Sequence, residues 1–234
     1  ADLKGVEGWP ADALLEHALT ISRGEAAMPY GAPPDVTLLD EYGYYPEDLV
    51  GRSTANTQEI AIADHALAEA FAARGADAAT VAALQVRAQT WKNLYDPATG
   101  WMHGRMSDGT WGDLGNVDIW NDDYAEGNAR QYLWMAPHDP DGLIEVLGGA
   151  DTVGPRLESF FEEAAEDATD DVRGLPEVHY WHGNEVDLHA AWMFNHLGQP
   201  ERTQHWVDWI WDTWYSTAPD GLAVVALLWH RVLE

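Results

Sequence analysis

One stretch of the sequence, Tyr124–Asp139, combines a single carboxylate with amide and aromatic side chains. Glu126 stands beside Gly127 and Asn128 in it, and the nearby rings are those of Tyr124, Tyr132 and Trp134. Apolar surroundings favour the protonated form of a carboxyl group, so Glu126 is suited to donate a proton to a sugar oxygen. The alternative is a carboxylate in the first turn of a helix over 125–135, stabilised by the helix dipole.

A second segment with chemical potential is W-H-G-N-E at Trp181–Glu185. Asn184 and Glu185 offer amide, backbone and carboxylate oxygens, which are the ligands that calcium prefers. An asparagine cap followed by a first-turn glutamate would explain the same pair. His182 and His189 flank it, and each either forms hydrogen bonds within the protein or recognises a hydroxyl group.

Two other clusters are interpreted mainly as structural. The N-D-D segment at 121–123 lacks the glycine and the terminal glutamate of a calcium loop, so we interpret it as a solvated turn. Trp206, Trp209, Ile210 and Trp214 have the spacing of one buried helix face. Trp211 falls off that face and is the better candidate for a cleft.

Composition restricts the classes of partner. The formal net charge is -28, with 40 acidic and 12 basic residues, and such a surface repels nucleic acid and anionic membranes. The same charge attracts metal cations or reflects a high-salt habitat. There are no cysteines and therefore no disulfides or thiolate chemistry, while the 13 tryptophans suggest a tryptophan-lined cleft suited to the apolar faces of sugars.

The elements that must position these residues are predicted to be helices. Apolar periodicity and capping signals predict helices over 10–22, 53–74, 77–94, 125–135, 141–147, 155–167, 186–197 and 201–215, and the final stretch, 223–233, is largely apolar. Asn56 and Glu59 have the spacing of a capping box for the second helix. The stretches 23–52 and 95–123 are predicted to be long loops, and no run predicts a strand.

Short links alternate with long loops along this series, which is typical of helical hairpins with their functional loops on one face. We therefore expect an all-α fold that is part of an α/α toroid, in one domain covering 1–234. No signal peptide is recognisable in the chain. The longest apolar run, 222–229, is shorter than the roughly 20 residues that a membrane helix requires.

Several segments then match one known family in their order along the chain. They are G-Y-Y-P (43–46), T-Q-E-I-A-I-A-D (57–64), R-A-Q-T-W-K-N-L-Y-D-P-A-T-G-W-M-H-G-R (87–105), D-G-T-W (108–111), Y-A-E-G-N-A-R-Q-Y-L-W-M-A-P-H-D-P-D-G-L-I (124–144), G-N-E (183–185), G-Q-P-E-R-T-Q (198–204) and P-D-G-L (219–222). Together they resemble glycoside hydrolase family 92, the calcium-dependent α-mannosidases. The resemblance covers 43–222 and is specific mainly through the shared order.

The resemblance implies an (α/α)6 toroid and hydrolysis of α-mannosidic bonds with inversion. In the E-G-N motif, Glu126 matches the general acid. The implied calcium ligands are Asn184 and Glu185, and calcium in such enzymes contacts mannose hydroxyls and helps to distort the ring. The implied substrate-binding residues are Asn128, Trp181, His182 and Glu185. A mannose-containing oligosaccharide or glycan is the expected partner, and a secreted or periplasmic location is expected.

The sequence departs from the family after P-D-G-L. The family continues into a G-N-D-D segment whose aspartates supply the catalytic base, whereas this chain continues A-V-V-A-L-L-W-H-R-V-L-E. The N-terminal β-rich domain of the family is also missing, so we expect a truncated catalytic domain. An inactive carbohydrate-binding module and a purely structural helical fragment are the alternatives.

Overall fold

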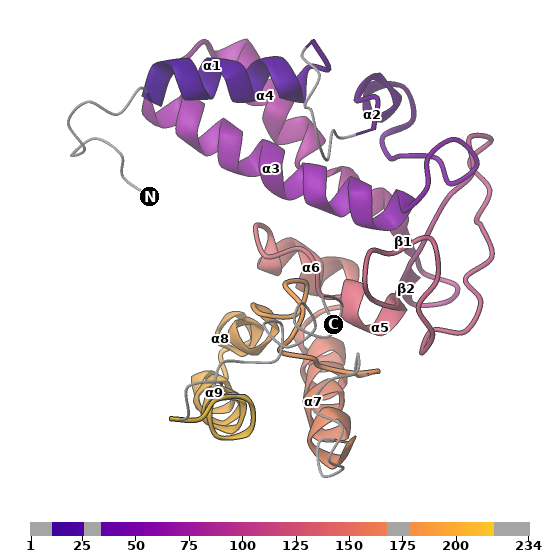
Figure 1. The fold of residues 1–234 in the computed structure, drawn as a ribbon, viewed down its shortest axis with the longest axis vertical. Coiled ribbons are helices and arrows are strands. Elements are labelled where there is room, and N and C mark those ends of the chain that lie inside the picture. The colour runs from indigo at the N-terminus through magenta and orange to yellow at the C-terminus, as the bar shows by residue number, and fades with distance from the viewer. Residues whose placement is uncertain (1–10, 26–33, 168–177, 218–234) are drawn as a thin grey trace, which may run out of the picture. The chain divides into compact units, whose positions relative to one another are not determined.

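The computed structural model describes residues 11–25, 34–167 and 178–217, and helices predominate there (Figure 1). Its elements are α1 (Ala11–Ser22), α2 (Thr37–Tyr42), α3 (Ser53–Ala73), α4 (Ala78–Arg87), the 3-10 helix η2 (Thr90–Leu94), β1 (Tyr95–Asp96), β2 (Trp101–Met102), α5 (Ala129–Tyr132), α6 (Pro140–Val146), α7 (Ala150–Asp167), the 3-10 helix η3 (Ala190–Trp192), α8 (Met193–His196) and α9 (Pro200–Trp214). The predicted all-α class is confirmed. None of the helices in these ranges is both long and apolar enough to cross a lipid bilayer.

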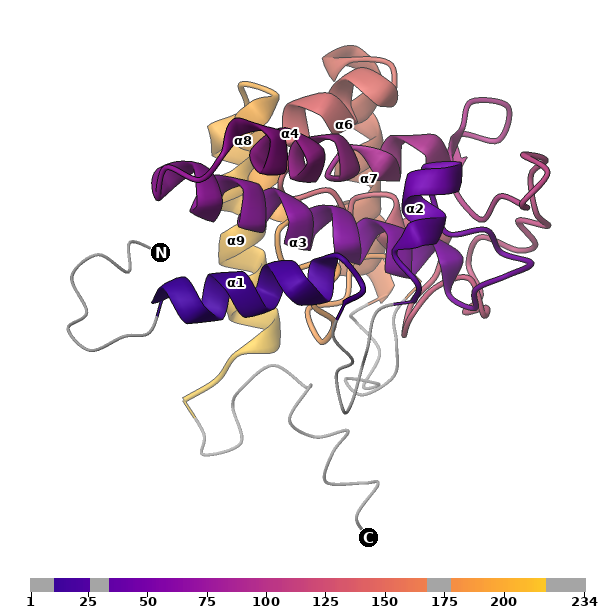
Figure 2. The ribbon, with the colours of Figure 1, turned by 90° about the horizontal axis from the view of Figure 1, so that it is seen from above.

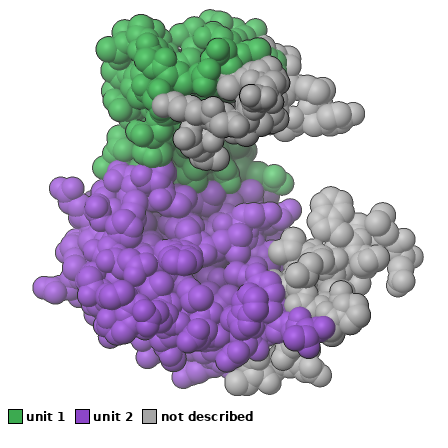
Figure 3. Space-filling view, turned by 90° about the vertical axis from the view of Figure 1, so that its left-hand side faces the viewer, with its two compact units in different colours: residues 1–94, 104–112 green, residues 95–103, 113–234 purple. Residues whose placement is uncertain are grey.

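The chain divides into two compact units, which Figure 3 colours separately. Unit 1 consists of Ala1–Leu94 with Gly104–Gly112, and unit 2 of Tyr95–His103 with Asp113–Glu234. The single domain over 1–234 stays a prediction. The two segments singled out from the sequence, around Glu126 and Asn184, both belong to unit 2.

Unit 1 is built on α3, with α1 and α4 packed along it (Figures 1 and 2). The apolar faces that the sequence predicts meet here in a core of Leu19, Ala68, Phe71 and Leu84. Asp77 caps α4 by accepting hydrogen bonds from two backbone amides of its first turn. Helices α3 and α4 therefore form the hairpin that the short link over 74–77 predicts, and α1 packs against α3.

Some boundaries in unit 1 differ from the prediction. Asn56 and Glu59 do not cap α3: the helix begins after Arg52, a left-handed residue with φ 56, and the Asn56 side chain binds the Gly51 carbonyl instead. The expected helix over 77–94 ends at Arg87 and continues after a break as η2. The expected loop over 23–52 contains the short helix α2.

Unit 2 has an aromatic core. Phe161 on α7 stacks against Trp206 on α9 at 5.1 Å between ring centroids, and its ring is tilted against that of Tyr180 at 4.6 Å. Trp206, Ile210 and Trp214 are buried, as their helical spacing predicts, whereas Trp209 on the same predicted face is only partly buried and Trp211 is 66% exposed. Large rings dominate the energetics of such a core because each buries a large area. This core supports the loops that carry the candidate residues.

Boundaries in unit 2 differ most around the candidate residues. The expected helix over 125–135 shrinks to α5, and the expected helix over 186–197 to η3 and α8. The loop over 95–123 contains the two-residue strands β1 and β2, which pair antiparallel, although no strand was expected. Helices α6 and α9 lie close to their predicted ranges, and α7 begins five residues earlier with Pro155 inside it. The apolar stretch over 223–233 lies outside the described residues.

Candidate active site

Glu126 lies in a tight loop before α5 and not in the first turn of a helix, so that expectation was wrong. Its backbone is in the left-handed region, with φ 53. A non-glycine residue pays about 1–2 kcal/mol for this conformation, and such strain is concentrated at functional sites. The Glu126 side chain is exposed, and its carboxylate forms no hydrogen bond or ion pair with another described residue.

The next two residues explain how the loop is held. A Cβ added to Gly127 would lie 2.9 Å from the Tyr132 ring, so the backbone approaches that ring too closely for a side chain. Asn128 caps α5 by accepting from the backbone amides of Arg130 and Gln131, and the Gln131 side chain accepts from the Asn128 backbone. This reciprocal pattern is a capping box. It fixes the point at which the loop ends.

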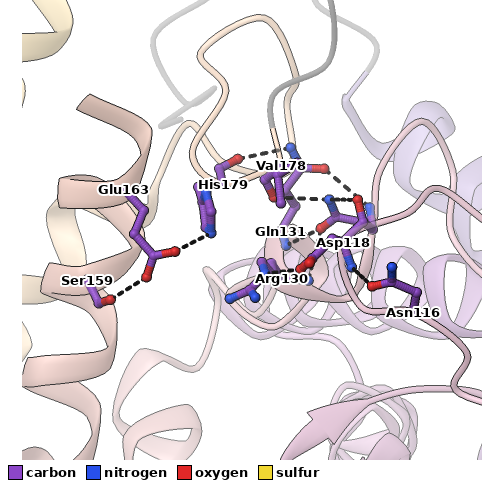
Figure 4. A network of polar contacts seen from close by, with 9 residues as sticks. Asn116, Asp118, Arg130, Gln131, Ser159, Glu163, Val178 and His179 are labelled. Carbon is purple, nitrogen blue, oxygen red and sulfur yellow. Dashed lines mark hydrogen bonds and ion pairs between the residues drawn. The ribbon is translucent and has the colours of Figure 1, made fainter. Parts of the chain in front are cut away.

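The same cap joins α5 to the segment that leads into W-H-G-N-E. The Asn128 amide donates to the Val178 carbonyl at 3.0 Å, and the Gln131 amide donates to the His179 carbonyl at 3.1 Å. Figure 4 labels Gln131, Val178 and His179 in this network. Asn128 is fully buried and its side chain is engaged within the protein. It therefore positions the site here, and direct substrate contact stays a prediction.

The aromatic residues near Glu126 support its loop from the buried side. The Tyr132 hydroxyl donates to the Ala125 carbonyl at 2.7 Å and accepts from the Ala125 amide at 3.2 Å. The Tyr124 hydroxyl donates to the Met102 carbonyl at 2.7 Å. The two tyrosine rings lie 5.1 Å apart, and both are buried. They order the backbone on either side of Glu126.

A direct hydrogen bond connects the two candidate segments. The side-chain amide of Asn184 donates to the Glu126 carbonyl oxygen at 2.5 Å. Asn184 is buried and the neighbouring Glu185 is exposed. The fold therefore brings together two residues 58 positions apart. This contact is the geometric basis for treating both segments as one site.

Trp181 and Asp187 hold the second segment. The Trp181 backbone amide donates to the fully buried carboxyl group of Asp187 at 3.2 Å, and burial raises the Asp187 pKa well above its ordinary value. A Cβ on Gly183 would lie 2.5 Å from the Trp181 indole, which is why this position is a glycine. The buried indole N–H of Trp181 has no partner among the described residues.

The two histidines of this region are held by hydrogen bonds. His182 lies between two hydroxyl groups, with Nδ1 2.5 Å from Tyr180 and Nε2 2.7 Å from Tyr215. His189 Nε2 lies 2.6 Å from the Trp134 carbonyl oxygen. Burial lowers the pKa of both histidines, so the neutral form is favoured. Recognition of a hydroxyl by His182 stays a prediction.

The oxygen donors of Asn184 and Glu185 are of the kind that calcium prefers, but they are too few to hold the ion. Asn184 and Glu185 are adjacent oxygen donors, and the Glu185 carboxylate contacts no other residue in the part of the chain that the structure describes. Calcium takes about 6–8 oxygen ligands. Within the described ranges, no three His, Cys, Asp or Glu side chains gather in a metal-binding cluster. A calcium ion at Asn184 and Glu185 would thus need further ligands.

Sequence reasoning missed Gln131, Asp187 and Tyr215, which help to build this site. The capping-box spacing of Asn128 and Gln131 was available as a signal, and Asn128 was named only for substrate binding. Asp187 and Tyr215 carried no local signal, because their roles depend on contacts with Trp181 and His182. The N-D-D segment is an exposed turn in which the Asn121 side chain accepts from the Asp123 amide, as interpreted.

Comparisons with known proteins identify one family. Residues 1–223 match the profile of the family described as Glycosyl hydrolase family 92 catalytic domain. A search among curated proteins found no match.

Solved structures resemble the chain closely. A family 92 inverting mannosidase from Bacteroides thetaiotaomicron VPI-5482 superposes with a TM-score of 0.80 at 26% identity, over 94% of this chain and 31% of that chain. A family 92 alpha-mannosidase from Bacteroides thetaiotaomicron superposes with a TM-score of 0.77 at 30% identity, over 94% of this chain and 28% of that chain. The same enzyme in complex with mannoimidazole has a TM-score of 0.77 at 28% identity, over 94% of this chain and 29% of that chain. The chain thus spans under a third of the length of these enzymes.

Proposed function

Because the chain belongs to glycosyl hydrolase family 92, we propose that it carries part of the active site of an α-mannosidase that inverts configuration. The proposal is supported by the similarity to an inverting mannosidase and to an alpha-mannosidase solved with mannoimidazole. The proposed substrate is a mannose-containing oligosaccharide or glycan. The remaining length of such an enzyme would contribute the rest of the site.

In this proposal, Glu126 protonates the oxygen of the departing sugar. Its exposed carboxylate is free to meet a ligand, while its backbone is fixed by Asn184 and by the capping box that follows. Inverting hydrolysis also needs a second carboxylate about 6.5–9.5 Å away, which activates water on the opposite face of the ring. No residue of this chain is proposed for that role.

Asn184 and Glu185 are proposed to hold calcium. The Asn184 amide nitrogen faces the Glu126 carbonyl, so its oxygen remains for a ligand, and Glu185 adds a carboxylate oxygen. When bound, calcium supplies charge and coordination for sugar hydroxyls. The chain itself orients the amide and keeps Glu126 beside it.

The observation that carries the proposal is the Asn184–Glu126 hydrogen bond, because it joins the two segments at which acid chemistry and metal binding are expected. The test is to incubate the protein that contains this chain with an α-mannoside and to follow the anomeric protons of the product by NMR. We expect β-mannose as the first product and no turnover after chelation of calcium. α-Mannose as the first product, or a rate indifferent to chelator, would contradict the proposal. Binding of mannoimidazole without turnover would identify a carbohydrate-binding protein instead.

A further inference from the structure

A cavity of about 150 Å³ lies in unit 2, away from Glu126 and Asn184, neither of which lines it. Its walls are mostly apolar, from Trp101, Leu133, Trp134 and Phe160, and its polar lining includes Arg130, Arg156, Ser159, Glu163 and His179. The volume corresponds to about five water molecules at about 30 Å³ each. An apolar pocket with a few convergent polar groups is typical of a small-molecule site.

Arg156 is the unusual group in this cavity. Its guanidinium lies on the face of the Trp101 indole, 4.2 Å from the ring centroid. No carboxylate within the described ranges contacts Arg156, although the chain has 40 acidic residues. Burial lowers the pKa of Arg156, and the positive charge of Arg130 acts in the same direction. An arginine stays charged all the same, so among the described residues this side chain is a partly buried cation without a counterion.

The other charged groups of the lining are already paired, as Figure 4 shows. Arg130 forms an ion pair with Asp118 at 2.5 Å. Glu163 contacts His179 at 2.8 Å and accepts a hydrogen bond from Ser159 at 2.6 Å. Each of these charges is compensated locally. The guanidinium on Trp101 is therefore the positive group in the cavity that an incoming anion would meet.

We propose that this cavity binds a small organic carboxylate, whose charged group pairs with Arg156 and whose apolar body lies among Leu133, Trp134 and Phe160. A guanidinium presents N–H groups in a planar fork that matches a carboxylate, and its charge balances one negative charge. A mainly apolar wall favours a carboxylate with a hydrocarbon body over a strongly hydrated phosphate. The inference goes beyond sugar hydrolysis and does not depend on it.

The test compares benzoate with benzamide, which has nearly the same shape and no charge. Titration calorimetry on the protein should give a benzoate affinity at least about tenfold higher, the usual effect of one charged hydrogen-bonding pair. Arg156→Gln should remove this preference, and Arg156→Lys should retain part of it. The matched control is Arg202→Gln, since Arg202 pairs with Glu158 at 2.9 Å and does not line the cavity.

Three results would overturn the inference. Equal affinities for benzoate and benzamide in the unsubstituted protein would show that charge is not recognised, and this comparison needs no variant to fold. Absence of binding by both compounds would show that the cavity takes neither. A benzoate preference that survives Arg156→Gln, with an unchanged circular dichroism spectrum, would place the anion elsewhere. Glu126→Gln should leave benzoate binding unchanged, which separates this inference from the proposed hydrolysis.

Discussion

The side-chain amide of Asn184 donates a 2.5 Å hydrogen bond to the backbone carbonyl oxygen of Glu126. This bond crosses from the loop before α5 to the loop before η3, and it acts on the backbone of Glu126, so that the carboxylate stays free. The left-handed backbone of Glu126, with φ 53, is held between this bond and the cap at Asn128. The proposed acid is thus positioned by two asparagines that need not touch the reacting atoms.

Replacing Asn184 tests whether this bond holds the two loops together. Asn184→Ala should lower the free energy of unfolding by about 1–3 kcal/mol, because a part-buried carbonyl loses its donor. Urea unfolding followed by tryptophan fluorescence measures this change. Asn195→Ala is the matched control, since Asn195 is exposed on α8. An equal effect of the two substitutions would show that the bond contributes nothing to stability.

Replacing Glu126 with glycine separates its backbone from its chemistry. Glu126→Gly should leave the free energy of unfolding unchanged or raise it by up to about 1 kcal/mol, because glycine adopts a positive φ without the steric cost and loses more chain entropy. Arg52→Gly offers a comparison at the other left-handed non-glycine position, where φ is 56. Thermal unfolding of both variants measures the change. A loss above about 1 kcal/mol at Glu126 alone would mean that its side chain stabilises the fold.

Calcium should stabilise the protein if Asn184 and Glu185 are ligands. Excess calcium at about 100 times its dissociation constant would add about 2.7 kcal/mol, which raises the melting temperature. Glu185→Gln should weaken this response, because a carboxylate oxygen is replaced by an amide. Asp122→Asn is the matched control in the exposed N-D-D turn. A calcium response that is lost in the control and kept in Glu185→Gln would assign the metal to the turn.

The partly buried His189 predicts a dependence of stability on pH. Burial lowers its pKa in the folded protein below the ordinary value of about 6.5, so the unfolded chain takes up a proton first as the pH falls. The contribution of neutral His189 to the free energy of unfolding is complete above about pH 6.5. Below that pH it decreases by at most about 1.4 kcal/mol per pH unit. The free energy of unfolding, measured in urea at pH 7.5 and at pH 5.0, should fall less between these pH values in His189→Gln than in the unsubstituted protein. The exposed His17→Gln should match the unsubstituted protein, and an equal loss in all three would contradict this assignment.

Several parts of the fold were predictable from the sequence. The burial of Trp206, Ile210 and Trp214 follows from their spacing, which places them on one face of α9. Periodicity also located α1, α3 and α9 to within a residue or two at each end. The all-α class was predictable for the same reason. Tertiary contacts were not needed for these inferences.

The details of the site were less predictable. The pattern over 125–135 favoured a helix that included Glu126, but the chain is still a loop at Gly127, whose backbone lies so close to the Tyr132 ring that an added Cβ would be 2.9 Å from it. The capping box at Asn128 then starts the helix later. The Asn184–Glu126 bond joins residues 58 positions apart, and no local pattern encodes it. Resemblance named both residues, and only the fold shows how they are connected.

The most direct test of the central claim is the rate of Glu126→Gln on two α-mannosides that differ in leaving group. Glutamine keeps the size of the side chain and cannot donate the proton. The account predicts that kcat/KM for a disaccharide falls by about 10²–10⁴-fold, whereas the loss for a dinitrophenyl mannoside, whose leaving group needs no proton, is much smaller. An undiminished rate on the disaccharide, or an equal loss on both substrates, would contradict the assignment of Glu126 as the general acid.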